Sequence, residues 1–136
     1  MKRHLLGMLT PSSNTVLEPV TTAMLSGLED VTAHFGRFRV TEISLRDQAL
    51  GQFQTAPMLT AAELLADAKV DTICWNGTSA GWLGFQADED LGAEITAATG
   101  ITTCSSVLAI NQIFRLTGVK SYGLVTPYVD AIQNAI

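Results

Sequence analysis

Residues 70–81 have the sequence VDTICWNGTSAG, in which a short apolar run leads directly into a turn of small and polar residues. We predict a buried strand over residues 70–75 and a turn over residues 76–81. A helix should follow, because Leu91 and Ile95 recur at helical spacing and Gly100 is suited to end it. This order of strand, polar turn and helix is the unit that decides the fold.

The same unit recurs along the rest of the chain. Further strands are predicted over residues 5–9, 31–43, 101–104 and 122–125. Helical periodicity follows over residues 17–28 and 107–116, and Gly118 should cap the second of these helices. Alternating strands and helices predict an α/β fold, with a parallel Rossmann-like sheet and helices on both faces. In such sheets ligands bind beyond the carboxyl ends of the strands.

Helix starts and loops carry their own signals. Thr15 with Glu18, and Thr60 with Glu63, have the spacing of capping boxes. Residues 46–58 are predicted to form a loop. Thr126-Pro127 should supply an N-cap followed by proline at the first helical position.

We expect residues 1–119 to form an N-terminal α/β half and residues 120–136 to begin a second, truncated half. Val129, Ile132 and Ile136 start an amphipathic pattern that lacks a helix-stop signal, so more protein is expected to follow. A faint repeat supports this division, because Thr-Pro follows a predicted strand at residues 10–11 and again at residues 126–127.

Composition narrows the class of protein. The 136 residues are 47% apolar and 15% charged, with a net charge of −5, which is typical of a folded domain rather than a disordered chain. Basic clusters are lacking, so we expect no nucleic-acid partner. No apolar stretch approaches a membrane span or a signal sequence, so we expect no membrane association and a cytoplasmic location.

Two polar turns are candidates for anion binding. Ser12 and Asn14 lie in a turn that leads into a helix, where free N–H groups and the helix dipole favour an anion, although plain helix capping would use the same residues. Thr78 and Ser79 follow Gly77 and could direct N–H and O–H donors at one oxyanion. Tyr128 could add a phenol donor, or be an ordinary half-buried tyrosine.

Residues 77–81 also match the G-x-S-x-G signature of serine hydrolases. A catalytic histidine should follow the serine in that class, but His4 and His34 both precede Ser79, so a hydrolase would need a histidine from outside this chain.

The two cysteines lack metal-ligand spacing. Cys74 is expected to be a small buried hydrophobe that points into the core. Cys104 lies near a helix start that could lower its pKa, although packing is the simpler role.

Three segments together resemble one superfamily, that of aspartate/glutamate racemase. Residues 7–15, GMLTPSSNT, are similar to the first strand and turn of maleate cis-trans isomerases. Residues 70–79 resemble the third strand and its Cys-Thr-Ser turn, and residues 123–128, GLVTPY, resemble the segment that opens the second half. The resemblance implies two similar α/β halves with the active site between them, and neither a metal nor an organic cofactor.

The resemblance also implies roles for particular residues. Asn14, Thr78, Ser79 and Tyr128 would bind a small carboxylate substrate. Gly77 stands where most members have a first-half cysteine, and arylmalonate decarboxylases share this departure. We therefore expect a decarboxylase-like enzyme that stabilises an enediolate and uses a cysteine beyond residue 136. A maleate isomerase or a racemase using Cys104, and a non-catalytic carboxylate-binding protein, are the alternatives. A homo-oligomer is possible.

Overall fold

The computed structural model describes residues 2–39 and 55–136. In chain order the elements are β1 (His4–Pro11), α1 (Leu17–Met24), β2 (Val31–Phe38), α2 (Ala56–Asp67), β3 (Thr72–Trp75), α3 (Ala80–Leu83), α4 (Phe85–Thr99), β4 (Thr103–Ser105), α5 (Ser106–Thr117) and α6 (Asp130–Gln133). The predicted strand beyond residue 39 and the predicted loop up to residue 54 lie outside the described residues. Among the described residues, no helix has the length and apolar character needed to cross a bilayer.

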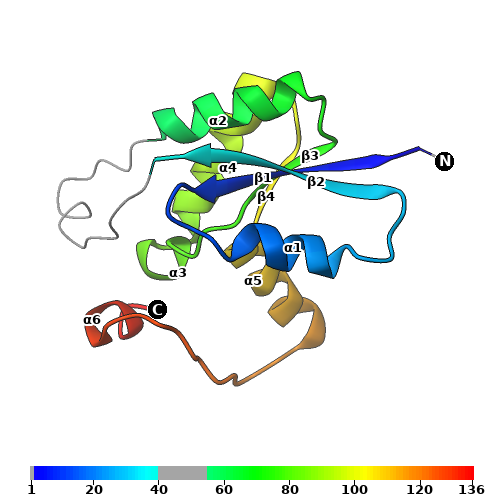
Figure 1. Cartoon of the computed structure of the whole chain (residues 1–136). Coiled ribbons are helices and arrows are strands. Elements are labelled where there is room, and N and C mark those ends of the chain that lie inside the picture. Colours follow the sequence, from blue (N-terminus) through cyan, green and yellow to red (C-terminus); the bar gives the residue numbers. More distant parts are fainter. Residues whose placement is uncertain (1, 40–54) are drawn as a thin grey trace.

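The four strands form one parallel sheet in the order β2-β1-β3-β4. Figure 1 shows α2 and α4 on one face and α1 and α5 on the other. The predicted α/β class is confirmed. Parallel neighbours require a crossover, and each helix between two strands supplies one. The carboxyl ends of β1 and β3, which are adjacent in the sheet, therefore carry their turns to the same edge.

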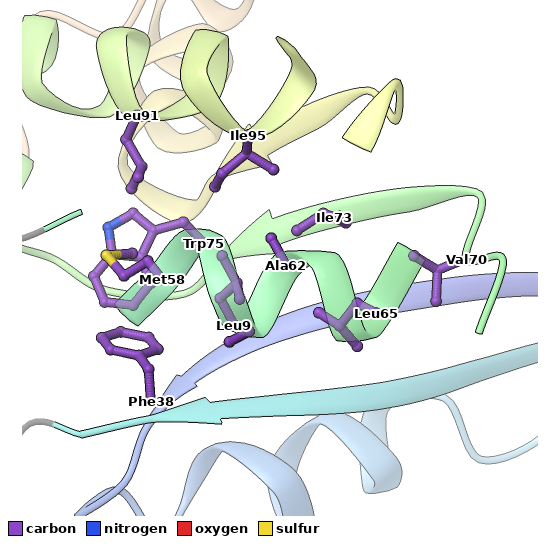
Figure 2. Close-up of a cluster of buried hydrophobic side chains, with 11 residues drawn as sticks. Leu9, Phe38, Met58, Ala62, Leu65, Val70, Ile73, Trp75, Leu91 and Ile95 are labelled. Carbon is purple, nitrogen blue, oxygen red and sulfur yellow. The ribbon is translucent and has the colours of Figure 1, made fainter. Parts of the chain in front are cut away.

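The hydrophobic core lies between the sheet and the α2 and α4 helices (Figure 2). Leu9, Ile73 and Trp75 enter it from the two central strands, and Ile95 enters it from α4. Burial of each such side chain contributes about 1.5–3 kcal/mol. Because side chains alternate along a strand, the residues between these point to the opposite face.

That opposite face is packed more lightly. Neither α1 nor α5 contains a buried residue. Large apolar side chains remain exposed on both helices, including Met24 at 76% and Leu116 at 79%. The proposed division into two halves at residue 119 stays a prediction.

The chain after α5 differs from the expectation. Residues 122–125 form no strand, and α6 begins after Val129, so the predictions of a fifth strand and of a Thr126-Pro127 helix start were wrong. Val125 is 96% exposed and pairs with no strand of the described sheet, whereas Tyr122 stacks on Phe114 with ring centroids 4.7 Å apart. The segment instead runs back on the side of α5 that faces away from the sheet and places α6 near α3 (Figure 1).

Both predicted capping boxes were wrong. Asn14 caps α1, since its Oδ1 accepts from the backbone N–H groups of Val16 (2.9 Å) and Leu17 (2.8 Å). Helix α2 begins at Ala56, so residues 56–58 are helical rather than loop, and Thr60 bonds back to the Ala56 carbonyl from inside the helix. A proline in the first turn explains the earlier start.

The two predicted helix ends at glycine were confirmed. Gly100 and Gly118 adopt left-handed conformations, with φ of 71° and 66°, and their N–H groups bond back to the preceding turn.

Candidate functional site

The turn after β1 is held by backbone contacts to the neighbouring strand. The Ser12 N–H donates to the Phe38 carbonyl at 2.8 Å, and the Asn14 N–H donates to the Pro11 carbonyl at 3.0 Å. The Asn14 side-chain oxygen serves the start of α1, as the capping interpretation anticipated. Asn14 is thus placed at the predicted edge of the sheet with its side-chain oxygen engaged as a cap.

Arg37 on β2 holds this turn from the side, a role that sequence reasoning missed. Its Nη1 donates to the carbonyls of Ser12 and Asn14, each at 3.0 Å. Its Nε and Nη2 contact one carboxylate oxygen of Glu18 at 2.9 and 2.8 Å. The guanidinium fork thereby ties the turn, the first turn of α1 and β2 together. Only the pairing of β1 with β2 reveals these contacts, since they span 19 to 25 residues of the sequence.

The turn after β3 requires glycine at position 77. A Cβ built on Gly77 would lie 1.9 Å from Cζ2 of Trp75 and 2.4 Å from two further ring atoms. Trp75 is only 5% exposed, and its ring packs against Phe38 with centroids 5.5 Å apart. The indole therefore occupies the space that any side chain at position 77 would need.

Thr78 and Tyr128, two of the predicted site residues, are brought together although 50 residues separate them. The threonine hydroxyl and the phenol share a short hydrogen bond, and the Tyr128 ring lies edge-on to Trp82 with centroids 5.1 Å apart. Within the described chain, no hydrogen bond engages the backbone N–H groups of Thr78 or Ser79. Two amide donors and two hydroxyls therefore lie at one strand end.

Ser79 borders a cavity of about 160 Å³, whose lining includes neither Thr78 nor Tyr128. The cavity is lined by Thr55, Ser79, Leu83, Ala87, Asp88, Asp90, Leu91 and Glu94. Three of these residues are acidic, so this hollow is a poor receptor for an anion. A carboxylate would be better placed on the side of Thr78 and Tyr128.

Asp88 is buried, which the acidic run at residues 88–90 did not reveal. Burial raises the pKa of its carboxyl group, while Ser105 and Trp75 oppose that shift. Its Oδ2 and the indole Nε1 of Trp75 are both buried without a hydrogen-bond partner. Ser105 and Trp75 offset the burial only in part, because the pKa of the Asp88 carboxyl group stays raised, so its ionisation costs stability.

Cys74 and Cys104 are paired across β3 and β4. Cys74 is half-buried on the face opposite the main core, so the prediction that it points into the core was wrong; strand alternation turns it away from its neighbours Ile73 and Trp75. Contact with the Cys74 thiol lowers the pKa of exposed Cys104 to about 6. The lowered pKa of Cys104 agrees in direction with the prediction, but its principal cause is Cys74 rather than the helix start.

These features define what the edge can do chemically. The Thr78 and Ser79 N–H groups, with whichever of the Thr78 and Tyr128 hydroxyls does not donate to the other, can hold a carboxylate and any negative charge that develops on it. In the described parts of the chain, no cluster of three or more His, Cys, Asp or Glu side chains could hold a metal ion.

Comparison with known proteins follows this geometry. No protein-family model and no curated protein matches the chain. Among solved structures, maleate cis-trans isomerase from Nocardia farcinica, a cysteine-to-serine mutant with a covalently bound succinylcysteine intermediate, is 23% identical with a TM-score of 0.77 and matches over 97% of this chain and 56% of its own.

Two structures of arylmalonate decarboxylase also match nearly the whole of this chain. The unliganded structure is 18% identical with a TM-score of 0.68, over 97% of this chain and 54% of its own. A liganded double mutant, with a glycine replaced by cysteine and a cysteine by serine, is 17% identical with a TM-score of 0.76, over 98% and 55%. This chain spans about half the length of these proteins. It therefore has the fold of arylmalonate decarboxylase and maleate cis-trans isomerase, the fold that the sequence resemblance predicted.

Proposed function

We propose that the chain forms the substrate-carboxylate side of a cofactor-independent decarboxylase, isomerase or racemase. The observation that carries the proposal is the group of donors after β3: the Thr78 and Ser79 amides without intramolecular acceptors, beside the Thr78 and Tyr128 hydroxyls. The shared fold supports the same class of enzyme.

The proposed chemistry is stabilisation of a carbanion next to a carboxylate. The substrate carboxylate accepts hydrogen bonds from the Thr78 and Ser79 amides and from the Tyr128 phenol. Loss of carbon dioxide or of a proton leaves an enediolate, whose added charge strengthens these bonds in the transition state. A cysteine outside residues 1–136 delivers or removes the proton.

Gly77 favours the decarboxylase-like version with one cysteine. A two-cysteine reaction of the racemase kind would need a thiol at position 77, and the indole of Trp75 fills that space. Cys74 does not substitute for it, because its sulfur is directed at the side chain of Asn76, with Sγ to Oδ1 of 3.4 Å. Thr78 and Ser79 then act as oxyanion donors rather than as nucleophiles.

The test uses the full-length protein and three probes: an arylmalonate, maleate and L-aspartate. Carbon dioxide release, fumarate formation and loss of optical rotation distinguish the three reactions. Thr78→Val removes a hydroxyl at the site, and Thr60→Val removes one on the exposed surface of α2 as a matched control. Because the Thr78 hydroxyl bonds to the Tyr128 phenol, its loss should misplace that donor, and we expect the first variant to lower kcat by about 10²–10³ and the second to leave it unchanged. Equal turnover of both variants would remove Thr78 from the mechanism.

Two alternative functions can be tested with the same protein and probes. Cys104 is exposed with a lowered pKa, which a maleate isomerase or racemase reaction could use. Cys104→Ser in the full-length enzyme tests this, and unchanged turnover excludes that cysteine. A non-catalytic carboxylate-binding protein would show a raised melting temperature with dicarboxylates, but turnover of none of the three probes.

A further inference from the structure

The two cysteines of the chain lie directly opposite each other on neighbouring parallel strands. Cys74 pairs with Cys104 in the register of β3 and β4, and partners in register project from the same face of the sheet. Neighbouring strands are about 4.8 Å apart, which falls within the span of about 4.4–6.8 Å between the Cα atoms of disulfide-linked residues. The separation expected from this register is therefore compatible with a disulfide.

The two thiols differ in access and in acidity. Cys104 is exposed, whereas Cys74, beside it on the neighbouring strand, is half-buried. The Cys74 thiol lowers the pKa of Cys104 to about 6, and the proximity of Cys104 together with burial raises the pKa of Cys74. One sulfur is thus an accessible thiolate and the other a protected thiol within its reach, the division found in redox-sensing cysteine pairs.

We propose that Cys74 and Cys104 form a redox-active pair that closes to an intramolecular disulfide when the protein meets a hydroperoxide. The register of β3 and β4 carries this inference, and it does not depend on the proposed enzymatic function.

The reaction proceeds in two balanced steps. The Cys104 thiolate attacks an oxygen of the hydroperoxide, the O–O bond breaks, and Cys104 becomes a sulfenic acid while hydroxide or alkoxide leaves and takes a proton from solvent to become water or an alcohol. The Cys74 sulfur then attacks the Cys104 sulfur, and the departing hydroxyl takes the Cys74 proton away as water. The two thiols lose two electrons, which the hydroperoxide accepts. A thiol reductant reverses the reaction through a mixed disulfide.

Asn76 connects this pair to the turn after β3. Its Oδ1 accepts from the Cys74 thiol and from the Ser106 hydroxyl, each at 3.4 Å, and its Nδ2 donates to the Cys74 carbonyl at 3.1 Å. Disulfide formation removes the Cys74 S–H group that donates to Asn76, and Asn76 directly precedes Gly77. Any effect on turnover rests on the proposed function, whereas formation of the disulfide does not.

The experiment is peptide mapping of the full-length protein after hydrogen peroxide treatment, with alkylation of the remaining thiols. We expect a crosslinked peptide pair that joins residues 74 and 104, lighter by two hydrogen atoms than the separate peptides and restored by dithiothreitol. In Cys74→Ser, Cys104 loses both its resolving thiol and the contact that lowers its pKa, so it should oxidise more slowly and end as sulfinic acid without a crosslink. In Cys104→Ser, oxidation of Cys74 should be slower by roughly tenfold or more, because it lacks an accessible thiolate.

Two results would overturn the proposal. In the unsubstituted protein, Cys104 could be recovered as sulfinic acid with Cys74 still reduced. Alternatively, only crosslinks between separate molecules could form. Because the readout is a covalent bond, it gives the same answer whether or not the three substrate probes are turned over.

Discussion

Replacing Gly77 by alanine should destabilise the protein by about 2 kcal/mol, because the new methyl group meets the Trp75 ring. The built Cβ lies 1.9 Å from Cζ2, whereas ordinary van der Waals contact begins near 3.4 Å. The ring would have to move by more than an ångström. Such a move takes the buried indole away from its preferred rotamer, at about 0.5–1.5 kcal/mol. It also disturbs the contact with Phe38, at 5.5 Å between centroids, which is worth about 0.5–1.5 kcal/mol.

Urea and thermal unfolding of the full-length protein measure this effect. A loss of about 2 kcal/mol should lower the melting temperature by roughly 6–10 °C for a domain of this size. Gly81→Ala is the matched control, because a Cβ there meets only the Ile136 side chain at 3.7 Å and the position is helical. We expect this control to be neutral or slightly stabilising.

A double-mutant cycle identifies the ring as the cause. Trp75→Phe removes the atoms that the Cβ of residue 77 would contact, at the cost of a cavity. Gly77→Ala should therefore destabilise the Trp75→Phe background by about 1 kcal/mol less than it destabilises the natural protein. The reasoning is refuted if Gly77→Ala unfolds at the same urea concentration as Gly81→Ala, or if the two substitutions at positions 75 and 77 are simply additive.

Two further predictions concern the surroundings of the site. Arg37→Met removes three donor groups that contact the turn at residues 12–14 and Glu18. We expect faster amide hydrogen exchange at Asn14, with exchange in the core unchanged. Exchange rates equal to those of the unsubstituted protein at every position would contradict the anchoring role. Asp88→Asn should raise the melting temperature at about pH 7 but not below about pH 3.8. The pKa of Asp88 is raised in the folded state, so the folded protein favours the protonated acid. The stability that this protonated acid contributes is lost as the pH rises through the folded pKa. A series of melting curves across pH measures this effect, and a benefit that does not vary with pH would contradict it.

The parts of the fold that follow from local physics were predictable from the sequence. Helical and strand periodicity reflect which face of an element is buried, so the alternation of strands and helices implied a parallel sheet. Gly100 and Gly118 were identified as helix ends because left-handed backbone is open to glycine at little cost. The polar turns after β1 and β3 were placed at one edge because parallel strands end together.

The wrong secondary-structure predictions share one cause: a local sequence pattern does not show which distant segment an element packs against. Residues 122–125 have a strand-like apolar run, but Val125 finds no neighbouring strand among the described residues and stays exposed. Thr60 and Glu63 have capping-box spacing, yet the helix had already begun at Ala56. Several residues can start a helix, and the choice between them depends on packing against the sheet.

The sequence alone determined the class of fold and the candidate donors, because both depend on residue types at short spacing. Only the tertiary structure decided which distant groups meet: the Thr78 hydroxyl with the Tyr128 phenol, Arg37 with the turn at residues 12–14, and Cys74 with Cys104. It also decided that the Trp75 ring fills the space above Gly77. These contacts follow from strand order and register, which are set by crossover packing between segments far apart in the chain, and no local pattern encodes them.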